Sequence, residues 1–256
     1  MPRTTVQIYE IQDAQEAREM ARLGVDTVGS VLTSRQDWKQ DSLVKSMAAA
    51  RDAGLTTSLI PLFSEPGLVL EVLDYYKPDM AHFCDTLTNA AGYPLDLALF
   101  ISLQEQVRTA FPKMRIMRSI PIARPGKGHV TPTLKLAMAL EPVSDVFLTD
   151  TWLGDSTGAE PSDPVQGYIG ITGLICDWDI AADLVKQSAI PVILAGGISP
   201  GNAYEGVLRV RPAGVDSCTQ TNALDENGSP IRFKKDPEKV QALVNEVARA
   251  DTEIAG

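Results

Sequence analysis

The sequence predicts a single (β/α)₈ barrel. Eight short runs rich in Val, Ile, Leu and Ala alternate with eight longer stretches that have the hydrophobic spacing of helices. The chain contains 256 residues, which is close to the roughly 250 that one such barrel needs. Eight consecutive strand–helix units favour closure into a barrel, and an open doubly wound sheet is the alternative. We therefore expect one domain that spans residues 1–256.

The expected elements follow one another in a regular order. The runs expected to be strands are residues 5–11, 26–32, 56–61, 79–84, 114–120, 145–150, 191–195 and 214–219. The stretches expected to be helices are residues 13–23, 39–53, 67–76, 95–111, 133–140, 178–187, 202–210 and 237–250. The composition of the runs is typical of a parallel sheet that is buried on both faces.

Residues at the junctions support these boundaries. Asp13 is a candidate N-cap for the first helix, with Glu16 three residues later as in a capping box. Asp177 is a candidate N-cap for the sixth helix. Gly24 and Gly54 stand where two helices should end. The two segments of residues 150–177 and 220–237 are longer than a plain barrel needs, and both follow strands, at the end where barrels keep their sites.

The charge and the cysteine content narrow the class of protein. A net charge of −10 argues against a nucleic-acid partner and against binding to anionic membranes. No apolar stretch is long enough to span a membrane and no signal peptide pattern is present, so we expect a cytoplasmic protein. The three cysteines are widely spaced, which favours neither a disulfide framework nor a zinc site. We expect no metal and no organic cofactor.

Several motifs occur in a characteristic order along the second half of the chain. LTDT (148–151) ends the sixth strand, GITGLICDW (170–178) precedes the sixth helix, and LAGGISPGNA (194–203) follows the seventh strand. GVDSCT (214–219) and KKDPEKV (234–240) come last. This order resembles that of the phosphoribosylanthranilate isomerase family, and the Ser34-Arg35 pair resembles the family's Ser-Pro-Arg segment. The resemblance implies a ribulose-phosphate-binding barrel without cofactors.

The resemblance also implies a reaction, an Amadori rearrangement that converts an aminoaldose phosphate into an aminoketose phosphate. That intramolecular oxidation and reduction needs an acid to open the sugar ring and a base to take the C2 proton. Asp150 matches the family's acid, whereas Tyr9 stands where the family has its basic Cys. Strand alternation is expected to turn the neighbouring Glu10 away from the barrel interior. Cys84, which shares a face with His82, and Asp85 are therefore further candidates for the missing base, and Cys218 is a rival.

The expected binding residues come from four loops. Arg35 is placed to pair with the carboxylate of an anthranilate-like substrate. Glycine-rich turns offer backbone N–H groups to a phosphate, and Gln220 replaces a glycine of the family pattern. The expected phosphate-binding residues are Thr172, Gly173, Gly196, Gly197, Thr219 and Gln220.

Three hypotheses about function remain open at this point. The chain is an isomerase of tryptophan biosynthesis with a replaced base, a paralogue that acts on another sugar phosphate or small anion, or a catalytically inactive ligand-binding barrel. In each case we expect a phosphorylated small molecule as ligand, and a monomer or a homodimer. A close-packed Tyr9 that plugs the site would favour the inactive barrel, and a Tyr9 hydroxyl paired to a cation near an open pocket would favour an enzyme.

Overall fold

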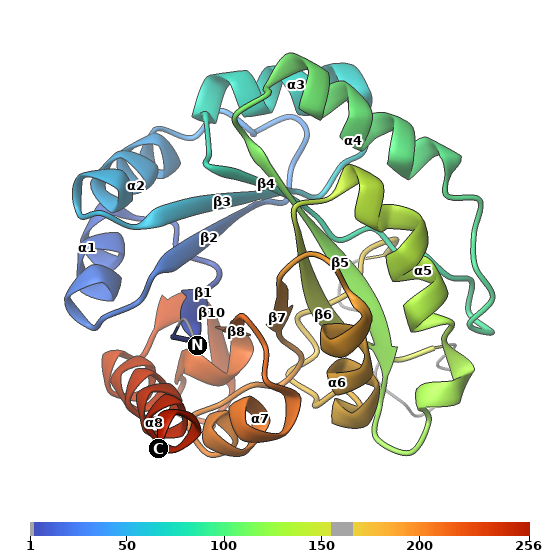
Figure 1. Cartoon of the computed structure of the whole chain (residues 1–256). Helices are drawn as coiled ribbons and strands as arrows, with labels where there is room; N and C mark the ends of the chain where they lie inside the picture. The colour runs from blue at the N-terminus through green and yellow to red at the C-terminus, as the bar shows by residue number, and fades with distance from the viewer. Residues whose placement is uncertain (1–2, 155–165) are drawn as a thin grey trace.

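The computed structural model describes residues 3–154 and 166–256, and within them it confirms the predicted barrel. Eight parallel strands close in sequence order, with β1 paired to both β2 and β8. Figure 1 shows the strands at the centre and the helices around them. The strands are Thr5–Ile8 (β1), Thr27–Leu32 (β2), Thr56–Pro61 (β3), Met80–Phe83 (β4), Arg115–Ala123 (β5), Val146–Trp152 (β6), Val192–Leu194 (β7) and Gly214–Ser217 (β8).

A helix follows each barrel strand. The helices are Ala14–Arg22 (α1), Asp41–Asp52 (α2), Pro66–Tyr76 (α3), Ala98–Ala110 (α4), Thr133–Leu140 (α5), Trp178–Gln187 (α6), Ala203–Val210 (α7) and Pro237–Ala255 (α8). None of the described helices combines the length and the apolar composition that a membrane crossing requires. Three short 3₁₀ turns, Gly128–Val130, Glu141–Val143 and Thr219–Thr221, complete the helical part of the described chain.

The predicted N-caps are confirmed, with one difference in how the first cap is built. The Asp13 carboxylate accepts from the backbone N–H groups of Gln15 and Glu16 at 2.8 and 2.9 Å. The Glu16 carboxylate does not close the capping box, because its Oε1 accepts from the Lys235 backbone N–H at 2.6 Å. Glu16 thereby ties the first helix to a segment at the far end of the chain.

Two regions extend beyond the predicted elements. The register of β5 and β6 continues to the pair Ala123–Trp152, so Asp150 lies within a strand and not at its end. The long segment after β8 contains an antiparallel hairpin of Asn222–Leu224 (β9) and Pro230–Lys235 (β10). This hairpin packs beside the C-terminal end of the barrel, where its residues contact Glu10 and Glu16.

The apolar core has an outer and an inner part. Most buried apolar side chains lie between the strands and the surrounding helices, as in the cluster that joins β1 and β8 to α1, α7 and α8. A smaller cluster inside the barrel includes Tyr9, Ile60, Met117 and Leu148. The inner cluster fills the barrel below its C-terminal end and supports the site above it.

Candidate active site

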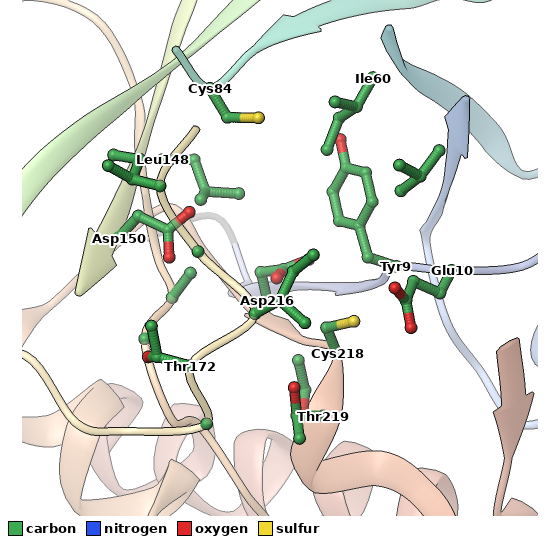
Figure 2. Close-up of a pocket in the computed structure, with 18 of the residues that line it drawn as sticks. Tyr9, Glu10, Ile60, Cys84, Leu148, Asp150, Thr172, Asp216, Cys218 and Thr219 are labelled. Atoms are coloured by element: carbon green, nitrogen blue, oxygen red, sulfur yellow. The ribbon is translucent and has the colours of Figure 1, made fainter. Parts of the chain in front are cut away.

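A cavity opens at the C-terminal ends of the barrel strands. Its lining residues come from all the barrel strands except β5, or from the residues directly after them, and from the segment that precedes α6. Figure 2 shows side chains from these elements, among them Asp150, Thr172 and Asp216, arranged around it. Barrels of this type carry their chemistry at this end, so the cavity is the candidate active site.

Residues 168–173 form one wall of the cavity. The Ile169 backbone N–H donates to the Cys84 carbonyl at 2.9 Å, which fixes the segment to the end of β4. Gly170 has φ +112°, and a Cβ there would lie 2.6 Å from Asp150 Oδ2. Glycine is therefore required at this position both by the backbone conformation and by the closeness of the Asp150 carboxyl group.

Asp150 directs its carboxyl group into the cavity (Figure 2). The side chain is partly exposed, and the Thr151 backbone N–H donates to its Oδ1 at 3.2 Å. A carboxyl group that is held by the backbone and faces a cavity can exchange a proton with a bound ligand.

The Tyr9 side chain is locked into the barrel wall. Its hydroxyl lies 2.6 Å from Ser58 Oγ and 2.5 Å from His82 Nδ1, and His82 Nε2 lies 2.8 Å from Ser119 Oγ. The Tyr9 ring occupies the space that a Cβ on Gly29 would fill, at 2.2 Å from its Cε1 atom. Burial raises the pKa of Tyr9 well above its usual value, and burial also lowers the pKa of His82 to about 3. Both groups are therefore neutral near pH 7 and poorly suited to remove a proton from carbon.

The other candidates for the missing base are placed differently. Cys84 lines the cavity, but burial raises the pKa of its thiol well above the usual value. Burial also raises the pKa of the Cys218 thiol, which lines the cavity as well. Asp85 is not among the lining residues, because its Oδ2 accepts from Arg118 Nη1 at 2.8 Å and its Oδ1 accepts from Ser64 Oγ at 2.5 Å. Its carboxylate is engaged in a buried ion pair.

Glu10 differs from the expectation that strand alternation turns it away from the barrel interior. β1 ends at Ile8, and Glu10 has φ +64°, so the alternation of a strand does not apply to it. Its side chain lines the cavity, and its carboxylate pairs with Arg232 of β10. Sequence reasoning missed this residue because a left-handed glutamate has no signal in the sequence.

Asp216 of β8 is a buried carboxyl group at the cavity. Its Oδ1 accepts from Gln7 Nε2 at 3.0 Å. Burial raises the pKa of Asp216 to about 7, although the Gln7 hydrogen bond and the charge of Lys235 act in the opposite direction. The carboxyl group thus holds its proton in the folded chain at pH values where it is ionised in the unfolded chain.

This pKa predicts a pH-dependent loss of stability. Folding stability contributed by the Asp216 proton is present below about pH 4 and is lost as pH rises through about 7. Between about pH 5 and pH 8, the free energy of unfolding of the wild type should fall by about 3 kcal/mol more than that of an Asp216→Asn variant. Urea denaturation of both proteins at the two pH values measures the difference. If the free energy of unfolding depends on pH identically in the two proteins, Asp216 does not hold a proton in the folded chain as described.

The predicted phosphate-binding residues lie together at the cavity. All six line it, and the Gln220 side chain donates from Nε2 to the Gly173 carbonyl at 2.8 Å. Gly197 has φ +65°, and a Cβ there would lie 2.5 Å from the Leu174 carbonyl carbon. The turns after β6, β7 and β8 therefore approach one another closely. We call this group the glycine niche: Thr172, Gly173, Gly196, Gly197, Thr219 and Gln220.

Arg35 lies outside this arrangement. It is not among the lining residues, and its guanidinium pairs with the carboxylate of Glu65 at the start of α3. Both side chains are about half exposed, at 58% and 47%. The structure therefore does not bring Arg35 together with Asp150 and the glycine niche.

The site contains no cluster of metal-binding side chains. Among residues 3–154 and 166–256, no group of three or more His, Cys, Asp or Glu side chains is arranged to hold a metal ion. The three cysteines, Cys84, Cys176 and Cys218, are all free thiols. The cavity lining offers carboxyl, hydroxyl and backbone N–H groups, together with the thiols of Cys84 and Cys218 and the imidazole of His82.

Comparison with known proteins identifies relatives along nearly the whole chain. N-(5'-phosphoribosyl)anthranilate isomerase 2 of Methanosarcina mazei is 28% identical over 230 residues, which are 90% of this chain and 89% of the relative. The N-(5'-phosphoribosyl)anthranilate isomerase of Haloferax volcanii is 28% identical over 225 residues, which are 86% and 85% of the two chains. No protein-family model matches the chain.

Solved structures show the same fold. The N-(5'-phosphoribosyl)anthranilate isomerase of Pyrococcus furiosus superposes with a TM-score of 0.64 at 16% identity, covering 96% of this chain and 99% of that chain. The phosphoribosyl anthranilate isomerase of Thermotoga maritima gives a TM-score of 0.63 at 16% identity with the same coverage. The sequence relatives and the shared barrel agree with the resemblance found in the motifs.

Proposed function

Because the chain is a divergent relative of the phosphoribosylanthranilate isomerases, we propose that it isomerises a phosphorylated ribosylamine from the aldose to the ketose form. The observation that carries this proposal is that Asp150 and the glycine niche line one cavity at the C-terminal end of the barrel. A structure of phosphoribosyl anthranilate isomerase in complex with a reduced aminoketose phosphate has a TM-score of 0.62 to this chain, which supports a ligand of the same kind.

Asp150 is assigned to the acid step of this reaction. Its protonated carboxyl group donates to the ring oxygen of the ribose, so the C1–O bond breaks and a C1=N iminium forms. A base then takes the proton from C2, and the C–H electron pair becomes the C1=C2 double bond of an enaminol. Ketonisation of the enaminol leaves a carbonyl at C2 and two hydrogens at C1. The reaction is an internal transfer of hydrogen and needs no cofactor.

The glycine niche is assigned to the substrate phosphate. Close turns without side chains can direct several backbone N–H groups at one anion. The hydroxyl groups of Thr172 and Thr219 line the same part of the cavity and can donate to phosphate oxygens. Anchoring the phosphate there places the sugar between the niche and Asp150 (Figure 2).

A substitution in the niche should weaken phosphate binding. In Gly197→Ala, the new Cβ would meet the Leu174–Ile175 backbone at 2.5–2.8 Å, and φ is +65°. The two turns must separate, so we expect affinity for ribose 5-phosphate to fall at least about tenfold, a change of about 1.4 kcal/mol. Gly201→Ala is the matched control, since the nearest atom to its Cβ is 3.7 Å away. Calorimetric titration compares them, and equal affinities would argue against the niche as the phosphate site.

A second candidate substrate follows from the charge of the cavity. Among the described residues that line it, none is a lysine or arginine, whereas Glu10, Asp150 and Asp216 all carry carboxyl groups. Arg35, the cation expected for an anthranilate carboxylate, is paired with Glu65 outside the cavity. These charges favour a phosphorylated ribosylamine whose amine substituent carries no carboxylate. The chain is then a paralogue with the same reaction and a different substrate.

Steady-state kinetics with two substrates tests both forms of the proposal. Freshly prepared phosphoribosylanthranilate and its analogue made from aniline differ only in the carboxylate. Turnover of either substrate above the uncatalysed rate supports the isomerase. A preference for the anthranilate compound assigns it to the reaction of its relatives, and a preference for the aniline compound favours the paralogue. No turnover of either one would overturn the proposed function.

A further inference from the structure

Glu10 occupies an unusual backbone conformation at the mouth of the barrel. Its φ of +64° places a non-glycine residue in the left-handed region, directly after the strand that ends at Ile8. Such conformations are strained and persist where the surrounding structure enforces them, often at functional sites. Here the consequence is that Tyr9 and Glu10, although adjacent in sequence, both line the cavity.

The Glu10 carboxylate has one oxygen engaged and one without a partner. Its Oε1 accepts from Arg232 Nε at 2.8 Å, and also from Arg232 Nη2. Its Oε2 is buried and has no described partner at hydrogen-bond geometry, and the Cys218 thiol interacts with the same carboxylate. The Glu10 side chain is only 1% exposed. A buried carboxylate oxygen without a partner is unfavourable for folding, so it calls for an explanation.

The β9–β10 hairpin holds this carboxylate in place. Arg232 reaches Glu10 from β10, while Lys235 of the same strand donates from Nζ to the Cys218 carbonyl at 2.9 Å and to Asn222 Oδ1. The hairpin is thus fixed to the ends of both β1 and β8. Because Arg232 binds Oε1 alone, it orients the carboxylate and leaves the buried Oε2 without a hydrogen-bond partner among the described residues.

Asp150 and Glu10 lie on different sides of the cavity. Figure 2 shows Asp150 extending from β6 on one side and Glu10 following β1 on the other, with Asp216 between them. A ligand held by the glycine niche would have one carboxyl group on each side. An acid and a base on separate sides of one sugar are what ring opening and C2 deprotonation require.

We propose that Glu10 is the general base of the isomerisation, and that Arg232 is the residue that positions it. The assignment rests on the function proposed above. Glu10 Oε2 takes the proton from C2 of the ring-opened iminium and returns it to C1. The C2 hydroxyl proton passes through water to the Asp150 carboxylate. Both carboxyl groups are then restored, and no co-reactant is consumed.

Asp216 is less well placed for this role. It pairs in register with Gln7 of β1, whereas Glu10 lies three residues further along the chain toward the cavity mouth. Its Oδ1 is occupied by the Gln7 amide. Asp216 therefore contributes to the floor of the cavity, and Glu10 contributes to its side.

Glu16 offers a matched control for the test of Glu10. Like Glu10, it is bonded to the hairpin through Oε1, from the Lys235 backbone N–H at 2.6 Å, and its Oε2 is buried without a described partner. Unlike Glu10, it does not line the cavity. If Glu10 acts only by fastening the hairpin, then Glu10→Gln and Glu16→Gln should behave alike.

The experiment measures kcat, KM and the kinetic isotope effect of substrate deuterated at C2, for the wild type and both variants. We expect Glu10→Gln to lower kcat by about 10²–10⁴-fold with little change in KM, and Glu16→Gln to stay within about threefold. Binding of the reduced aminoketose phosphate should be retained in both variants, which verifies their folding.

The outcomes separate this inference from the function on which it rests. A wild type without turnover contradicts both. An active wild type together with an active Glu10→Gln, or with equal losses in the two variants, overturns the assignment of Glu10 alone. If Glu10→Gln does not fold, Glu10→Asp and Arg232→Gln replace it. Each should reduce kcat, with the isotope effect retained or increased, and unchanged kcat in both would also overturn the assignment.

Discussion

Replacement of Asp150 by asparagine is expected to lower kcat by about 10²–10⁴-fold, the usual contribution of a general acid. Asparagine has nearly the same shape, so it keeps the contact with the Thr151 backbone N–H and fits beside Gly170, where no side chain intervenes. It cannot deliver the proton that opens the ribose ring. Loss of phosphoribosylanthranilate fluorescence, corrected for the uncatalysed rate, measures the effect.

Asp145 provides the control for this substitution. It directly precedes β6, at the end of the strand opposite to the cavity, and its Oδ2 accepts from the Ile116 backbone N–H at 2.8 Å. Asp145→Asn should change stability and leave kcat within about twofold, because the residue is remote from the reaction. An Asp150→Asn variant that retained wild-type kcat would remove Asp150 from the acid role.

The second large effect is on stability, and it concerns the buried ion pair between Arg118 and Asp85. Arg118 is 1% exposed, and it donates from Nη1 to Asp85 Oδ2 at 2.8 Å and from Nη2 to the Asp85 carbonyl at 2.9 Å. Asp85→Ala would leave the Arg118 guanidinium charge buried, and position 85 would then offer it only the backbone carbonyl as an acceptor. Removal of one partner of a buried pair destabilises by about 3–5 kcal/mol, which urea denaturation can measure.

Two further variants establish the cause of that loss. Glu65→Gln breaks the exposed pair with Arg35, and it should reduce the free energy of unfolding by less than about 1 kcal/mol. A double variant, Arg118→Met with Asp85→Leu, removes both charges and should recover most of the stability lost in Asp85→Ala. A small effect of Asp85→Ala alone would show that water or another group compensates Arg118.

Much of the fold was accessible from the sequence, because each signal was local. Short apolar runs that alternate with helical stretches identified all eight barrel strands. Asp13 and Asp177 were recognised as N-caps, and in the structure they cap α1 and α6. The residues of the glycine niche were also accessible, because they stand in the motifs that resemble the isomerase family, and the structure gives Gly197 a positive φ that favours glycine. Asp150 was found from its place in a motif, and the structure then brought it to the same cavity.

The parts that could not be predicted depend on contacts between distant segments. The Tyr9 ring fits only because Gly29 on the neighbouring strand lacks a side chain, and its hydroxyl finds partners on β3 and β4. Glu10 turns toward the cavity because its backbone leaves the strand conformation and because Arg232 arrives 222 residues later. The pairing of Arg35 with Glu65 likewise depends on where α3 begins.

These contacts bear on how Tyr9 should be understood. Its ring lines the cavity and its hydroxyl is buried against Ser58 and His82, so Tyr9 contributes to the wall of the cavity. A residue that fills the position of a former base need not block the site, provided that another carboxylate reaches the ligand. The cavity between Glu10 and Asp150 supports a catalytic barrel more than an inactive one.

The measurement that tests the central claim most directly follows a ¹³C label at C2 of phosphoribosylanthranilate by NMR in the presence of the wild-type protein. The proposed isomerisation predicts that the carbinol signal of C2 disappears at a protein-dependent rate and that a ketone signal replaces it. If the labelled carbon of this substrate and that of its aniline analogue both appear only in ribose 5-phosphate, formed at the rate seen without protein, the chain isomerises neither and the account is contradicted.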